Sequence, residues 1–111
     1  MEIQKNNIFK ISHELPSRFE IFENIISNHE VTIERIISSG QKTPSNRWLH
    51  EDADEWVMLL QGTAEIRFID ETIIELVKGD YIIIPANTKH RVEHTSSDPP
   101  CIWLAVHGKF K

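Results

Sequence analysis

Several features that mark particular classes of protein are rare or missing in this sequence. Its single cysteine, Cys101, cannot form an intrachain disulfide, and 17 Asp and Glu residues outnumber 12 Lys and Arg residues. A net charge of -5 argues against nucleic-acid binding, because phosphate contacts need a concentrated basic surface. The start of the chain lacks the long apolar run of a signal peptide or membrane anchor. We therefore expect a cytoplasmic protein that binds neither nucleic acid nor membrane.

The composition that is present is typical of one globular domain. The chain has 111 residues, 40% hydrophobic and 26% charged, which is enough for one hydrophobic core and too little for two. It contains no low-complexity run, no repeat and no linker rich in Pro or Gly. We expect a single domain over residues 1–111, with a core at about 31–107 and an N-terminal strand or helical extension at 1–30.

Short apolar segments rich in Ile, Val, Trp and Tyr alternate with turn-forming segments along the chain. The connecting segments, such as "SSGQKTPSN", "KGD" and "SSDPP", have turn compositions. Residues 15–28 are ambiguous, and we expect a short helical turn followed by a strand there. The pattern predicts an all-β fold, an antiparallel sandwich or barrel. The predicted strands are 31–38, 55–62, 63–69, 72–77, 81–85, 90–94 and 101–107.

Two histidines four positions apart end the segment "GDYIIIPANTKHRVEH", residues 79–94. If the chain is extended there, His90, Val92 and His94 share one face, because side chains alternate along a strand. A closed barrel would then point Glu55 and His90 at each other across an apolar interior. A carboxylate and imidazoles in a cavity are the ingredients of a divalent metal site with open coordination positions. The alternative is a surface strand with incidental histidines.

The spacing in this segment resembles the second conserved motif of the cupins, a family of small β-barrels. Five residues separate Gly79 from Pro85, four separate Pro85 from His90, and three separate His90 from His94. Asn87 stands at the motif's second glycine, and asparagine tolerates a left-handed turn well.

An upstream segment, "WLHEDADEWVMLLQG" at residues 48–62, resembles the first cupin motif. Glu55 is followed by six residues and then by Gly62, as in the family, and 16 residues separate Gly62 from Gly79. That gap is typical of the smallest bacterial members. The resemblance, to small single-domain cupins of the cupin 2 type, covers about residues 31–107.

The first cupin motif also carries two histidines separated by one residue, and this chain lacks the first of them. Trp48 and His50 stand at those positions in one register, and Leu49 and Glu51 in the other. His94 stands at the asparagine position of the second motif. It either replaces the missing imidazole or hydrogen-bonds beside the site.

The resemblance implies an antiparallel cupin barrel, also called a double-stranded β-helix or jelly roll. It implies one divalent metal ion (Fe, Mn, Ni or Zn) and a small organic ligand, as in dioxygenases or isomerases. The alternative is a metal-free module that binds a small molecule or a protein through a degenerate site. Because exposed strand edges are usually paired, we also expect a homodimer. The metal-ligand candidates are His50, Glu55, His90 and His94, and the pocket-lining candidates are Trp48, Glu51 and His107.

Overall fold

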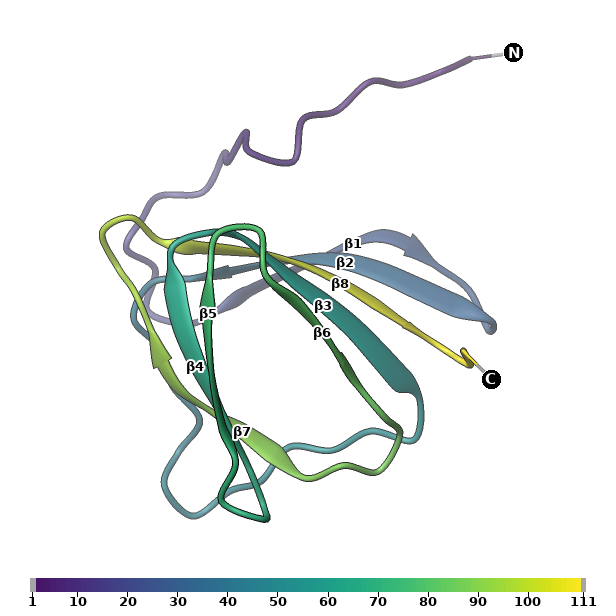
Figure 1. Ribbon diagram of the computed structural model, residues 1–111. Helices are drawn as coiled ribbons and strands as arrows, with labels where there is room; N and C mark the ends of the chain where they lie inside the picture. Colours follow the sequence, from purple (N-terminus) through teal and green to yellow (C-terminus); the bar gives the residue numbers. More distant parts are fainter. Residues whose placement is uncertain (1, 111) are drawn as a thin grey trace.

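Residues 2–110, the part of the chain that the computed structural model describes, form eight antiparallel β-strands and no helix (Figure 1). The seven predicted strands are confirmed, each within one residue at either end. Across the same residues, no helix is long and apolar enough to cross a bilayer. The strands are β1 (Ile21–Ser27), β2 (Val31–Ser38), β3 (Asp54–Gln61), β4 (Thr63–Phe68), β5 (Ile73–Val77), β6 (Tyr81–Ile84), β7 (His90–Thr95) and β8 (Cys101–Gly108).

The segment before β1 differs from the expectation. The strand itself forms as predicted, but residues 13–20 carry bends where a short helical turn was expected. Pro16 accounts for this difference, since proline lacks the N–H of a helical hydrogen bond and disfavours helical backbone at the preceding residue.

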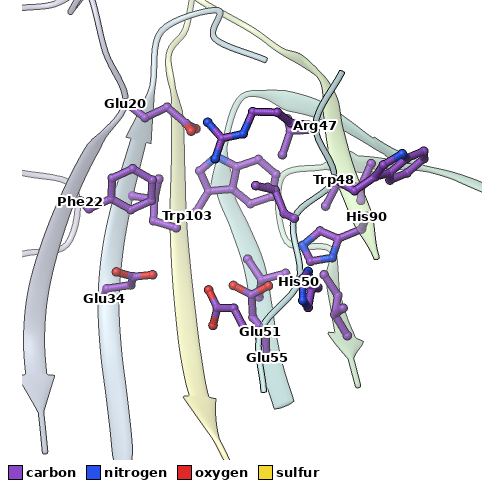
Figure 2. A pocket seen from close by; sticks show the side chains of 16 residues that line it. Glu20, Phe22, Glu34, Arg47, Trp48, His50, Glu51, Glu55, His90 and Trp103 are labelled. Atoms are coloured by element: carbon purple, nitrogen blue, oxygen red, sulfur yellow. The ribbon is translucent and has the colours of Figure 1, made fainter. Parts of the chain in front are cut away.

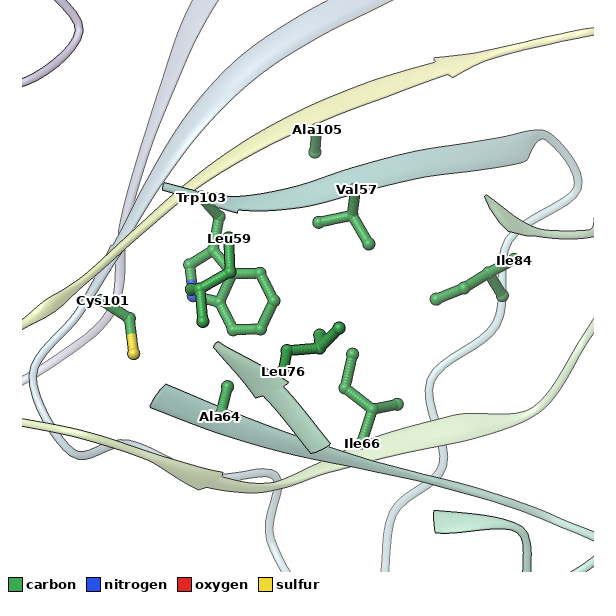
Figure 3. Packing of buried hydrophobic residues seen from close by; sticks show 9 residues of the cluster. All are labelled: Val57, Leu59, Ala64, Ile66, Leu76, Ile84, Cys101, Trp103 and Ala105. Carbon is green, nitrogen blue, oxygen red and sulfur yellow. The ribbon is translucent and has the colours of Figure 1, made fainter. Parts of the chain in front are cut away.

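Two sheets face each other and enclose the core, as in a jelly-roll barrel (Figure 1). The larger sheet has the strand order β1-β2-β8-β3-β6, and the smaller has the order β5-β4-β7. Alternation along β3 and β8 sends Val57, Leu59 and Trp103 inward, where they pack against Ala64 and Ile66 of β4 (Figure 3). The all-β cupin-type barrel predicted from the sequence is therefore the observed fold.

The core fills one end of the barrel and leaves the other end hollow. Leu59, Cys101 and Ala105 are completely buried. Trp103 and Ile66 belong to the core and also line a cavity, so they form its floor. Five of the seven site candidates of the sequence line that hollow end.

A β-bulge in β7 overturns the prediction that His90, Val92 and His94 share one face. Val92 pairs with Ile66 of β4, but His94 pairs with Glu65, so Glu93 is an extra residue without a partner across the ladder. One extra residue reverses the alternation after it. His90 is buried, whereas His94 is exposed on the outer face of the sheet.

The turn before β7 has the backbone expected from the sequence. Asn87 has a left-handed backbone with φ of 63°, so asparagine performs the role predicted for it at the motif's second glycine. Its N–H donates to the carbonyl of Glu51 at 2.6 Å, which ties this turn to the connection between β2 and β3.

Candidate functional site

A cavity of about 400 Å³ occupies the hollow end of the barrel (Figure 2). Two walls enclose it. The sheet wall consists of Phe22, Glu34, Ile36, Glu55, Val57 and Trp103 of the larger sheet, with Glu20 just before β1. The loop wall consists of residues 47–51 of the connection between β2 and β3, with His90 and Val92 of β7.

Strand pairing brings the carboxyl groups of Glu34 and Glu55 to one histidine, and the loop wall adds that of Glu51. His107 pairs with Glu55 across β8 and β3, and its Nε2 lies 2.9 Å from Glu34 Oε1 and 3.5 Å from Glu55 Oε2. Its Nδ1 lies 2.9 Å from Glu51 Oε2 of the loop wall. The sequence predicted that His107 lines the pocket. The imidazole contacts these carboxylates but is not among the side chains that line the cavity.

Burial and neighbouring charges shift the pKa values of two members of this cluster, His107 and Glu55. The hydrogen bond to Glu34 raises the pKa of His107 to about 9, against the effect of burial and together with the charges of Glu55 and Glu51. Burial raises the pKa of Glu55 to about 7, and the positive charge of His107 only partly offsets that rise. At neutral pH the imidazole is therefore a cation, and the Glu55 carboxyl lies near the midpoint of its titration.

The loop wall is held against the free edge of β7. Leu49 and His90 exchange two backbone hydrogen bonds, at 2.7 and 2.9 Å. Further along, the Thr43 N–H donates to the Val92 carbonyl at 2.9 Å, and the Val92 N–H donates to Thr43 Oγ1 at 3.0 Å. The connection thus extends the smaller sheet as an irregular additional strand.

Arg91 fixes the loop wall through its side chain. Its guanidinium donates to the carbonyls of Thr43 at 2.9 Å, Ser45 at 2.8 Å and Arg47 at 3.3 Å, and it lies over the ring of Trp48. Sequence reasoning missed this residue. Arg91 alternates with inward-facing neighbours, and no local signal in the sequence shows that the loop covers it.

The predicted site residues divide into a larger group inside the cavity and a smaller group outside it. The lining residues are Trp48, His50, Glu51, Glu55 and His90, and the two that do not line the cavity are His94 and His107. His50 and Glu51 are exposed at the mouth, whereas His90 is buried.

The side chains of the cavity only partly match the metal that the cupin motifs imply. His90 suits such a role, because its Nδ1 lies 2.8 Å from the Thr88 carbonyl oxygen and this leaves Nε2 for a metal. Glu55, however, is beside the His107 cation, and His94 faces solvent. Within residues 2–110, no three His, Cys, Asp or Glu side chains are grouped so that they could hold a metal ion. The donor set as arranged does not fit one.

Comparisons with known proteins agree with this architecture. The model of the family described as "Cupin domain" matches residues 34–107. A crystal structure from Ralstonia eutropha JMP134, provisionally assigned as a mannose-6-phosphate isomerase, is 35% identical. Its TM-score is 0.90, over 96% of this chain and 99% of that chain. No curated protein matches the sequence significantly.

More distant structures share the fold. A cupin superfamily protein from Desulfitobacterium hafniense DCB-2 is 20% identical, with a TM-score of 0.73 over 87% of this chain and 84% of that chain. The Fe(II) form of HppE is 9% identical, with a TM-score of 0.67 over 80% of this chain and 50% of that chain.

Proposed function

The chain belongs to the cupin family, and we propose that its barrel binds a small organic molecule with which Glu55 exchanges a proton. The observation that carries this proposal is a carboxyl group with a pKa of about 7 on the wall of a cavity. A strongly perturbed titratable group in a cleft is a candidate for acid-base chemistry.

The cavity has the dimensions and surface of a ligand site. Its volume of about 400 Å³ falls within the range of small-molecule pockets. Apolar side chains such as Ile36, Val57 and Trp103 make up much of the surface, and polar groups gather at a few points. A ligand could therefore bury its apolar part while its polar groups meet the carboxyls.

Glu55 can both accept and donate a proton at neutral pH. Its carboxylate form can accept a proton from an acidic C–H or O–H of the ligand, and the resulting carboxyl can return that proton to another ligand atom. A pKa near the working pH keeps both forms populated, which is the condition for efficient general acid-base catalysis. His107 stabilises the ionised form and positions the carboxyl between β3 and β8. The reaction class that follows is an internal proton transfer, such as an isomerisation.

A metal-dependent reaction in the same cavity is the second candidate. The orientation of His90 favours it, but further donors would have to rearrange around that residue. Elemental analysis of protein purified without a His-tag decides between the two. Stoichiometric metal that is lost from His90→Ala would replace the acid-base proposal with the metal-dependent one. Metal-free protein that still binds a ligand would support the acid-base proposal.

The direct test is to titrate Glu55 and to assay the cavity for ligands. Carbon-13 NMR of the glutamate carboxyls should show a group with a pKa of about 7 that is absent from Glu55→Gln. Mannose 6-phosphate is a natural first substrate to assay, because the relative from Ralstonia eutropha carries an isomerase name. Glu65→Gln, on the outer face of β4, is the matched control. An ordinary carboxyl pKa for Glu55 would contradict the proposal.

A further inference from the structure

We propose that the cavity selects an organic ammonium ion over neutral and phosphorylated molecules of similar size. This inference rests on the proposed small-molecule function and adds the chemical class of the ligand. The side chains on the two walls of the cavity support it.

The charged groups that line the cavity are mostly acidic. Four carboxyl groups face it, and Arg47 is the cationic side chain among the lining residues. Arg47 is exposed at the mouth, where solvent screens it, while Glu34 and Glu55 are largely buried. The carboxyl groups are those of Glu20, Glu34, Glu51 and Glu55.

The cation behind the cavity does not balance this charge. A single imidazole, that of His107, is shared among the carboxyls of Glu34, Glu51 and Glu55. At neutral pH the carboxyl of Glu55 is only about half ionised, but together with the carboxyls of Glu34 and Glu51 it still outweighs the single imidazolium. Glu51 is exposed, so the part of this surplus that acts through an interior of low dielectric constant lies at Glu34 and Glu55. A ligand that brings a second positive charge to this cluster would relieve the imbalance.

Aromatic rings provide the complementary surface for a cation. Phe22 and Trp103 line the sheet wall, and Trp48 lines the loop wall. Figure 2 shows the rings of Phe22 and Trp103 on the same wall as the carboxylate of Glu34. The indole N–H of Trp103 donates to Ser38 Oγ at 3.1 Å, which fixes the orientation of the ring. Aromatic faces attract ammonium groups, most strongly where water is excluded.

A phosphorylated ligand meets the opposite environment. A phosphate dianion in the cavity would lie among the same four carboxyl groups, with Arg47 as its guanidinium partner. Arg47 is exposed, so solvent screens the one guanidinium charge that it could offer to the phosphate. The cavity is therefore expected to bind a sugar phosphate weakly, whatever the name of its relative from Ralstonia eutropha.

The test uses three probes of matched shape and different charge. Benzylamine, benzyl alcohol and benzoate are titrated into the full chain at pH 7 by calorimetry, with mannose 6-phosphate as a fourth ligand. Benzylamine should bind at least about tenfold more tightly than benzyl alcohol, and benzoate should bind least. Added salt should weaken the binding of benzylamine and leave that of benzyl alcohol unchanged.

Variants of the lining residues test whether the preference for benzylamine arises in the cavity. Glu34→Gln should reduce benzylamine affinity about tenfold while benzyl alcohol still binds, which shows that the pocket remains folded. Glu20→Gln provides a second acidic position that does not contact His107, and Glu65→Gln on the outer face should change nothing.

Three results would overturn the ammonium proposal. They are equal affinities for benzylamine and benzyl alcohol, tighter binding of benzoate or mannose 6-phosphate, and no binding of any probe. In the first two cases a ligand still binds, so the proposed function stands and only the ligand class fails. In the third case the NMR titration of Glu55 decides the proposed function separately.

Discussion

The two walls of the cavity are held in place by different means. On the sheet wall, regular strand pairing sets Glu55 opposite His107 and Glu34 one strand further, so the backbone ladder alone positions them. On the loop wall, an irregular connection carries Trp48 and His50, and the buried side chain of Arg91 holds it to β7. One half of the site therefore depends on regular strand pairing, and the other half depends on a few backbone hydrogen bonds and on the side chain of Arg91.

The largest effect is expected from removing the side chain that holds the loop wall. Arg91→Ala should lower the free energy of unfolding by about 4 kcal/mol, because it leaves buried carbonyls and the carboxylate of Glu93 without a partner. Urea denaturation measures the change. Arg67→Ala is the matched control. Arg67 pairs directly with Arg91 across the sheet but contacts the exposed Glu71, so its loss should cost less than about 1 kcal/mol. Equal losses of unfolding free energy in Arg91→Ala and Arg67→Ala would show that Arg91 does not hold the loop wall in place.

The sheet wall should make stability depend on pH. The pKa of Glu55 is raised from 4.5 to about 7, so its stabilising contribution is present below pH 4.5 and is lost as pH rises through about 7. The pKa of His107 is raised from 6.5 to about 9, so its contribution is present below pH 6.5 and is lost as pH rises through about 9. The free energy of unfolding should therefore fall between about pH 5 and about pH 9, by roughly 6 kcal/mol if both shifts count in full and by about half of that if solvent screens the cluster.

Urea titrations across that range check this dependence. His107→Gln should flatten the upper part of the curve, since the group that titrates there is gone. A stability that rises between neutral and alkaline pH would contradict the charge assignment of the cluster.

A smaller effect should appear in the titration of Glu55 itself. His107→Gln removes the positive charge that lowers the pKa of Glu55 and leaves the burial that raises it. The pKa of Glu55 should therefore rise above about 7, as measured by carbon-13 NMR. His94→Gln, on the outer face of β7, should leave it unchanged. A pKa that falls in His107→Gln would show that His107 does not act on Glu55 through its charge.

The smallest effect is expected at the exposed histidine of β7. His94→Ala should change the free energy of unfolding by less than about 0.5 kcal/mol, because the side chain is exposed and pairs across from a polar residue. His90→Ala should cost about 2 kcal/mol, because it removes a buried ring and the hydrogen bond to Thr88. A loss for His94→Ala as large as that expected for His90→Ala would mean that both histidines face the interior.

The residues that the sequence placed correctly belong to regular strands. Strict alternation predicts that Glu55 faces the barrel interior, and the turn before β7 starts the strand with His90 facing inward. The prediction for His94 fails, because nothing in "HRVEHT" shows that Glu93 bulges. Arg91 was missed for a related reason, since its burial comes from a loop more than forty residues earlier in the chain. Local sequence patterns predict which face of a strand a residue occupies, but tertiary structure determines bulges and loop contacts.

The bulge at Glu93 also changes how this strand should be engineered. Residues up to Val92 follow one inward and outward order, and residues from His94 onward follow the opposite order. The next inward position after Val92 is Thr95, which is buried opposite Ala64. A designer who wants a second imidazole inside the barrel would therefore substitute Thr95, five positions after His90, and would treat His94 as a free surface position for labelling or immobilisation.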